Sequence, residues 1–322
     1  MNQEYQIYFA PFQGITNSIF RKIYAKHFQG IDKFYTPYFN KILTHNKLDS
    51  QKLGSLKNSY DKDINLVPQI LSRNAEEIIL FAQHCKEFGY KEINWNLGCP
   101  YPQVANKKLG SGLLPHPEMI DELLQKVMQE INISLSIKCR LGYHSSDEIL
   151  NLIPIFNAYP IHELIIHARI GKQLYSGNTD LETFSFISTK LNHTVVYNGD
   201  IFNVADYNQF KSHFPHIKKI MLGRGILTNP FLPVQIKRMN LPSNAAEKLR
   251  LFIDDLYFTY RKEKNDQLSL LSALKEYWIY FANAFVEHEK VLKKLKKCKR
   301  FDDYEDAVSA IFEENQLIIK RV

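Results

Sequence analysis

The sequence predicts an α/β protein, a (β/α)8 TIM barrel followed by a smaller C-terminal all-helical domain. Eight short runs rich in Ile, Val, Phe and Tyr alternate with amphipathic helical patterns, and from about Asn244 only helical patterns remain. A chain of 322 residues is long enough for a barrel of about 250 residues and an appendage. A doubly wound sheet is the alternative arrangement.

The eight predicted strands share a length of four or five residues and many β-branched or aromatic side chains. They span residues 7–10, 33–36, 66–70, 92–96, 135–139, 163–167, 194–198 and 218–222. Between them, segments such as 74–88 and 117–131 repeat apolar residues at helical spacing. Strands that alternate with helices pair in parallel, and eight such units close into a barrel.

The C-terminal segment carries two apolar stripes at helical spacing. The first consists of Leu249, Phe252, Ile253, Leu256, Tyr257 and Tyr260, and the second of Leu271, Leu274, Tyr277, Trp278, Phe281 and Phe285. We therefore expect two domains, a catalytic barrel over residues 1–240 and a basic helical domain over residues 241–322.

The charge balance favours a polyanionic partner. Lys and Arg number 41 against 34 Asp and Glu, which gives a net charge of +7 and a pI near 9.0. Residues 291–300 hold six of these cations. Such a run either contacts phosphates or is simply a solvated helix face.

Cysteine spacing and hydropathy exclude several classes. The four cysteines lie far apart without the spacing of a disulfide framework or a zinc site. No run reaches the roughly 18 apolar residues that a membrane-spanning helix needs. We expect a cytoplasmic protein with reduced thiols, no metal and no membrane association.

Polar or cationic residues follow seven of the eight predicted strands. These segments are 10–14, 68–70, 94–100, 138–140, 167–169, 198–200 and 223–225. In a barrel the carboxyl ends of the strands meet at one rim, where catalytic groups gather. So many polar groups at one rim indicate a ligand. The last two segments follow strands seven and eight, where barrels commonly bind a phosphate.

These segments resemble the motifs of the tRNA-dihydrouridine synthase family over nearly the full chain. The family's Asn-x-Gly-Cys-Pro signature matches residues 96–100, and its glycine-rich loop matches residues 107–114. Its Ala-Pro-Met, Pro-Gln, Lys-x-Arg and His-x-Arg elements match residues 10–12, 68–69, 138–140 and 167–169. The sequence departs from the pattern at Phe12, where Met is usual, and at Ala168, where Gly is usual.

The resemblance implies FMN as cofactor, NADPH or NADH as electron donor, tRNA as substrate and a monomer; ribosomal RNA is the alternative substrate. The implied cofactor-binding residues are Pro11, Phe12, Gln13, Gln69, Lys138, His167, Asn198, Gly199, Asp200, Gly223 and Arg224. The expected substrate-binding residues are Asn94, Asn96, Lys107, Arg140, Arg169, Lys293, Lys294, Lys296 and Lys297. His167 is otherwise a barrel-filling residue, and Asn94 a packed polar one.

Reduction of a uracil double bond needs a hydride at C6 and a proton at C5. The flavin supplies the hydride, and we expect Cys99 to be the acid, because a thiol with a pKa of about 8.5 is mostly protonated at neutral pH. A uridine within folded RNA must leave its stack to react. Two alternatives remain: an FMN-barrel reductase of a free small molecule, similar to dihydroorotate dehydrogenase or an ene-reductase, and a non-catalytic RNA-binding protein.

Overall fold

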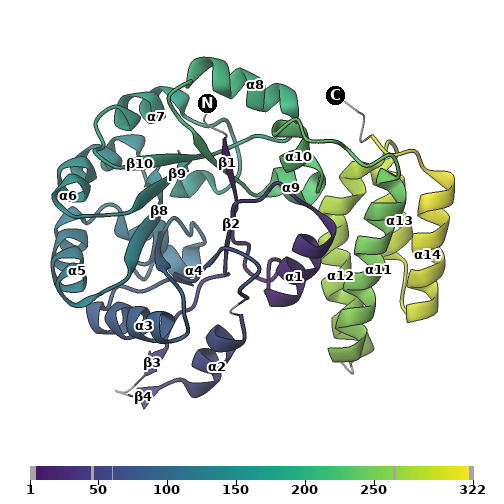
Figure 1. The fold of residues 1–322 in the computed structure, drawn as a ribbon, viewed down its shortest axis with the longest axis horizontal. Coiled ribbons are helices and arrows are strands. Elements are labelled where there is room, and N and C mark those ends of the chain that lie inside the picture. The colour runs from purple at the N-terminus through teal and green to yellow at the C-terminus, as the bar shows by residue number, and fades with distance from the viewer. Residues whose placement is uncertain (1–4, 45–46, 60, 264–265, 319–322) are drawn as a thin grey trace. The chain divides into compact units, whose positions relative to one another are not determined.

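The computed structural model describes residues 5–44, 47–59, 61–263 and 266–318 (Figure 1). The chain divides into two compact units. The barrel unit comprises Met1–Pro11, Asp32–Asp200 and His213–Met221, and the helical unit comprises Phe12–Ile31, Ile201–Ser212 and Leu222–Val322. The predicted domain boundary between residues 240 and 241 stays a prediction, and residues 1–4 and 319–322 of those domains lie outside the described chain.

The strands form a ring of parallel pairs. They are β1 (Gln6–Phe9), β2 (Lys33–Tyr35), β5 (Leu66–Val67), β6 (Gln69–Ile70), β7 (Glu92–Leu97), β8 (Ser134–Gly142), β9 (Glu163–Ile170), β10 (Thr194–Asn198) and β11 (Lys219–Leu222). They pair in the order β5-β2-β1-β11-β10-β9-β8-β7-β6. Only Pro68, which has no N–H to donate, separates β5 from β6. Segment 66–70 therefore pairs with β2 on one side and β7 on the other and closes the barrel.

The eight predicted strands and the predicted barrel are thus confirmed. Helices of the barrel unit cover the outside of the strands, as α3, α5, α6 and α7 show in Figure 1. The helices of this unit are α2 (Ser50–Ser59), α3 (Ala75–Glu87), α4 (Pro102–Ala105), η1 (Gly110–Leu113), α5 (Pro117–Glu130), η2 (Ser146–Leu152), α6 (Ile153–Ala158), η3 (Gly171–Gln173) and α7 (Leu181–Ser188). A hairpin of β3 (Leu43–Thr44) and β4 (Lys47–Leu48) precedes α2.

The predicted helix over 74–88 is α3, and its start follows the expected capping chemistry. The side chain of Asn74 accepts a hydrogen bond from the backbone N–H of Glu77, which would otherwise have no partner in the first turn. The predicted helix over 117–131 is α5, with Pro117 in its first turn.

The middle of the barrel is apolar. Side chains of alternate strand residues meet there in one buried cluster, formed by Tyr8, Ala10, Tyr35, Val67, Ile165, Val196 and Met221. Successive strand residues point to opposite faces, so the residues two positions further along each strand also point inward. These next inward residues include Gln69, His167 and Asn198, which are buried.

The floor of the barrel, at the amino ends of the strands, is ionic. Lys33 Nζ lies 2.8 Å from Glu92 Oε2 and 2.8 Å from Glu163 Oε2, and Lys219 also pairs with Glu163. Tyr8 Oη donates to Glu163 Oε1 at 2.8 Å. Burial alone would lower the pKa of Lys33, but the two carboxylates outweigh it and the pKa is raised. Lys33 therefore stays charged as the centre of a buried network.

The helical unit contains α1 (Ser18–His27), α9 (Arg224–Thr228), α10 (Leu232–Ile236), α11 (Ala245–Glu263), α12 (Gln267–Phe281), η4 (Ala282–Ala284), α13 (His288–Lys296), α14 (Phe301–Glu314) and most of α8 (Val204–His213). Both predicted apolar stripes are buried, and they lie on α11 and α12 with Phe285 just beyond. Within the described chain, no helix is both long enough and apolar enough to cross a bilayer.

Two tyrosines of the helical unit fix the segment that follows β1. Tyr277 Oη donates to the backbone oxygen of Ile15 at 2.8 Å, and Tyr260 Oη donates to Asn17 Oδ1 at the same distance. The two hydroxyl groups lie 2.8 Å apart. The ring of Phe12 lies edge-on to the ring of Tyr280, with 6.0 Å between centroids. α11 and α12 thus set the conformation of the turn that carries Phe12.

Removal of the central cation should destabilise the barrel. Lys33→Met leaves buried carboxylates without their shared counter-ion, so we expect the free energy of unfolding to fall by about 3 kcal/mol or more. Urea denaturation monitored by circular dichroism measures it. Lys290→Met is the matched control, because its exposed pair with Glu287 contributes at most about 1 kcal/mol. Equal losses in the two variants would contradict a stabilising role for the network.

Candidate active site

A chain of buried polar side chains runs up to the carboxyl ends of β6, β7 and β8. Asn94 Nδ2 donates to Ser136 Oγ at 2.9 Å, and Gln69 Nε2 donates to Asn94 Oδ1 at 2.7 Å. Asn96 Nδ2 then donates to Gln69 Oε1 at 2.7 Å. Each member is at least nine-tenths buried. Because a buried amide without partners costs about 1–3 kcal/mol, these side chains hold one another in a single arrangement.

This series of hydrogen-bonded side chains ends at the turn that carries Cys99. Asn96 Oδ1 accepts from the backbone N–H of Gly98 and of Cys99, both at 2.9 Å. From the other side, Ser111 donates its backbone N–H and its hydroxyl to the carbonyl oxygen of Cys99, both at 3.0 Å. Gly110 has a φ of +56°, and a Cβ there would lie 2.7 Å from that same carbonyl oxygen. The backbone of Cys99 is therefore fixed on both sides.

The Cys99 thiol lies in a small apolar cluster and is protonated at neutral pH. Leu71 and Val104 are buried with it, and Tyr38 and Leu109 pack against them. Burial raises the pKa of the thiol, and the Tyr101 backbone N–H, the Tyr38 hydroxyl and the charges of Arg140 and Lys138 oppose this only in part. A protonated thiol can donate a proton, which is the chemistry predicted for Cys99.

Lys138 is a half-buried cation on β8, and its ammonium group has no hydrogen-bonding partner among the residues that the structure describes. Burial and the neighbouring Arg140 charge lower its pKa to about 8. An anionic ligand would satisfy this group. Lys138 therefore fits the predicted contact with a flavin.

The guanidinium group of Arg140 is engaged by other groups of the protein rather than exposed to solvent. Its Nε donates to the backbone oxygen of Gly98 at 3.1 Å, and its Nη1 donates to that of Ile170 at 2.8 Å. Its guanidinium carbon lies 5.5 Å from the ring centre of Tyr175. Arg140 thereby ties the turn before Cys99 to the end of β9; a substrate contact by Arg140 stays a prediction.

Arg169 is likewise engaged within the protein. It pairs with Asp200 and donates to the backbone oxygens of Ser176 and Gly177, and only 1% of it is exposed. Its Nη1 also lies 3.4 Å from His167 Nε2. Arg169 and Asp200 thus hold the loop after β9, while the ligand contacts predicted for them and for His167 stay predictions.

The remaining predicted cofactor residues fall in both units. In the barrel unit, Asn198 Nδ2 donates to the Met221 oxygen at 2.7 Å, and a Cβ at Gly199 would lie 2.0 Å from Tyr197 Oη, so a larger residue there would have to displace the Tyr197 ring. Pro11 ends the first segment of this unit. In the helical unit, Gln13 is exposed, Gly223 precedes α9, and Arg224 lies over the Phe202 ring at 5.3 Å.

The lysines predicted to contact RNA lie at the surface, with one exception. Lys107 is exposed in the loop between α4 and η1, and Lys293, Lys296 and Lys297 are exposed on and just after α13. Lys294 is half-buried and pairs with Glu314 at 3.1 Å. The other three lysines of the α13 run are therefore better placed to meet phosphates.

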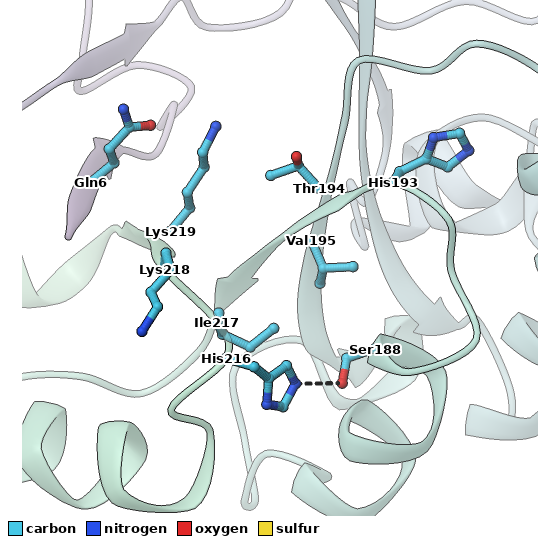
Figure 2. A pocket seen from close by; sticks show the side chains of 9 residues that line it. All are labelled: Gln6, Ser188, His193, Thr194, Val195, His216, Ile217, Lys218 and Lys219. Atoms are coloured by element: carbon cyan, nitrogen blue, oxygen red, sulfur yellow. Dashed lines mark hydrogen bonds between the residues drawn. The ribbon is translucent and has the colours of Figure 1, made fainter. Parts of the chain in front are cut away.

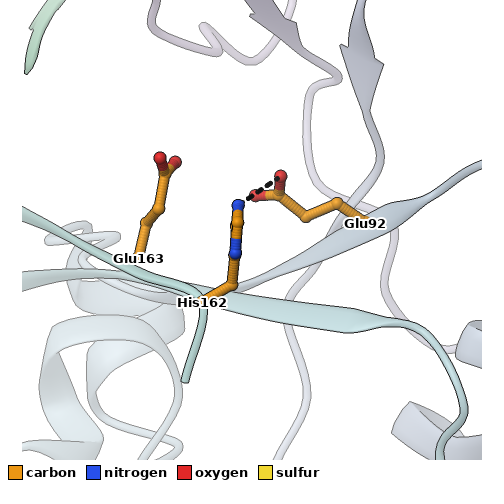
Figure 3. Close-up of side chains that lie close together, drawn as sticks. All are labelled: Glu92, His162 and Glu163. Atoms are coloured by element: carbon orange, nitrogen blue, oxygen red, sulfur yellow. Dashed lines mark ion pairs between the residues drawn. The ribbon is translucent and has the colours of Figure 1, made fainter. Parts of the chain in front are cut away.

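Two other features of the barrel unit lie at the opposite, amino ends of the strands. Glu92, His162 and Glu163 come close enough to hold a metal ion (Figure 3). The Lys33 ammonium bonds both carboxylates, however, and already supplies the positive charge. A hollow of about 430 Å³ adjoins this floor (Figure 2); its lining includes His193, His216 and Lys218, and His216 contacts Ser188.

A parallel barrel has a fixed thiol at the carboxyl ends of its strands, beside a cation with no partner among the described residues, which is where barrel enzymes place their catalytic groups. The sequence matches the dihydrouridine synthase (Dus) family over residues 8–316, so the chain belongs to that family and is an oxidoreductase. This confirms the resemblance seen in the motifs.

Curated relatives cover most of the chain. The tRNA-dihydrouridine synthase B of Pasteurella multocida is 28% identical over 228 residues, 70% of this chain and 67% of the relative. The tRNA-dihydrouridine(16) synthase of Neisseria meningitidis serogroup B is 25% identical over 312 residues, 94% and 93% of the two chains. The solved old yellow enzyme homologue from Zymomonas mobilis has a TM-score of 0.53 at 11% identity and covers 76% of this chain and 91% of its own. It shows the shared barrel fold.

Lys138 should lose its proton near pH 8. We expect its reaction with acetic anhydride, followed by mass spectrometry over a pH series, to have a midpoint at about pH 8, because burial and Arg140 disfavour the charged form. FMN should move that midpoint upward, since a nearby anion favours the ammonium. The exposed Lys107 calibrates the reagent in the same sample. A midpoint near 10.5, or one that FMN leaves in place, would rule out this account of Lys138.

Proposed function

We propose that the enzyme reduces specific uridines in tRNA to 5,6-dihydrouridine with FMN as cofactor and Cys99 as proton donor. The observation that carries this proposal is the position of Cys99, which Asn96 fixes at the carboxyl end of β7 and whose burial raises the pKa of the thiol. The two curated relatives described above are named as tRNA enzymes, which supports tRNA over ribosomal RNA as substrate.

The barrel unit offers groups that suit a flavin. Lys138 is a cation with no partner in the part of the chain that the structure describes, and it would stabilise negative charge on the polar edge of the ring. Gln69 is hydrogen-bonded to Asn96. Asn198 ends β10 and Gly199 follows it, at a position where barrels commonly bind phosphate. Pro11, Phe12, Gln13, His167, Asp200, Gly223 and Arg224 complete the proposed set of cofactor residues.

In the proposed reaction the bound flavin supplies a hydride to C6 of the uracil ring. Cys99 gives its proton to C5: its S–H bond breaks and a C–H bond forms. Asn96 positions the donor, because its Oδ1 accepts the backbone N–H groups of Gly98 and Cys99. Asn94 is hydrogen-bonded to both Gln69 and Ser136, so its proposed effect on the substrate acts through this series of hydrogen bonds.

The target base must leave its stack to reach the barrel mouth, and phosphate contacts then hold the RNA. We assign these contacts to Lys107, Lys293, Lys296 and Lys297, with Lys294 contributing less because of Glu314. NADPH, or NADH, is the proposed electron donor. All four cysteines are free and buried, which supports a cytoplasmic enzyme; we propose that it acts as a monomer.

Replacement of the proton donor tests the mechanism. We expect Cys99→Ala to retain FMN and to consume NADPH, but to form dihydrouridine in unmodified tRNA at least about 100-fold more slowly, as expected for loss of a general acid. Mass spectrometry of digested tRNA measures the product. Cys85→Ala is the matched control, since Cys85 is buried on α3 and should be dispensable. Full activity of Cys99→Ala would remove Cys99 from the proposed role.

A further inference from the structure

Tyr38 lies against the proton donor, although its segment was not among those that the motifs singled out. It follows β2 by three residues in the sequence Thr36-Pro37-Tyr38. The next residue, Phe39, donates its N–H to the Gln69 oxygen and accepts from the Leu71 N–H, both at 2.8 Å. The backbone around Tyr38 is thus attached to β6, beside the polar chain that leads to Asn96.

The side chain of Tyr38 is half-buried and packs on the cluster of Cys99, Leu71 and Val104. Its hydroxyl lies close enough to the Cys99 thiol for each group to shift the pKa of the other, with Cys99 raising that of Tyr38 and Tyr38 lowering that of Cys99. Burial first, and then the neighbouring Cys99, raise the pKa of Tyr38 to about 12. Tyr38 therefore keeps its proton at neutral pH and is the donor to any thiolate formed at Cys99.

We propose that Tyr38 is a positioning residue for the reduction: its hydroxyl stabilises the thiolate left on Cys99 and returns a proton to it from solvent. This inference rests on the proposed function of Cys99. After Cys99 has protonated C5, the Tyr38 O–H bond breaks as a new S–H bond forms, and the phenolate takes a proton from water. This relay moves only protons, so it needs no oxidant or reductant of its own.

The other groups that face the thiol cannot replace this hydroxyl. Arg140 is bound to two backbone oxygens, and Lys138 and Arg140 act on Cys99 through their charge alone. Tyr101 gives Cys99 a backbone N–H, while its exposed side chain lies near Tyr38. Among the described side chains, Tyr38 is thus the one that places an O–H group beside the thiol and is also partly exposed to solvent.

The first test measures Cys99 itself and needs neither flavin nor RNA. The rate of iodoacetamide labelling of the Cys99 peptide, followed by mass spectrometry over a pH series, reports the thiolate fraction. Tyr38→Phe should shift the midpoint to higher pH, because the thiolate loses a donor. Tyr101→Phe should leave it in place, since its backbone N–H remains. Incorporation of 3-fluorotyrosine at position 38, a stronger donor of the same shape, should shift it to lower pH.

The second test measures turnover. Tyr38→Phe should form dihydrouridine about tenfold to 100-fold more slowly than the wild type, as expected for a lost hydrogen bond to a charged group. If the wild-type protein forms no dihydrouridine, the proposed function fails. If it does, and Tyr38→Phe matches it in both labelling midpoint and rate, the function stands and the inference about Tyr38 is wrong.

Discussion

The site depends on one acceptor, the side-chain oxygen of Asn96. It receives the backbone N–H groups of Gly98 and Cys99, while the amide nitrogen of the same side chain is bound to Gln69. Three hydrogen bonds therefore couple the position of the thiol to the barrel interior. Because the side chain is buried, loss of any one bond would leave a polar group unsatisfied, and the turn has no equally favourable alternative. The backbone that carries the thiol is thus tied to the strands of the barrel.

The interior of the barrel changes in character from floor to mouth. The floor is an ion network around Lys33, the middle is an apolar cluster around Tyr35, and the mouth is a set of amides and cations around Lys138. The floor resembles a metal site in composition but contains its own counter-ion. The mouth differs because Lys138 has no partner among the described residues. Unmet charge, rather than the mere presence of ionisable groups, distinguishes the end where we propose that the ligand binds.

Much of this architecture could be predicted from the sequence, and the misses have physical causes. The strands and the buried stripes of α11 and α12 follow from hydrophobic spacing, which records burial directly. Sequence alone did not show which cations have partners within the protein: Arg140 and Arg169 look like Lys138 in the motifs, but backbone oxygens and Asp200 hold them. The substrate contacts predicted for these two arginines stay predictions. Tyr38 was missed because the segment after β2 was the one strand end not weighed. The residues Thr36-Pro37-Tyr38 were the available signal.

We propose that this fixed thiol serves uridine reduction in tRNA. The most direct measurement maps dihydrouridine by mass spectrometry in tRNA and ribosomal RNA from cells with and without the gene. The account predicts that dihydrouridine disappears from defined tRNA positions and returns with the wild-type gene but not with Cys99→Ala. Unchanged dihydrouridine in every RNA, in cells without a second enzyme of this family, would contradict it. Loss from ribosomal RNA alone would retain the chemistry and refute the substrate.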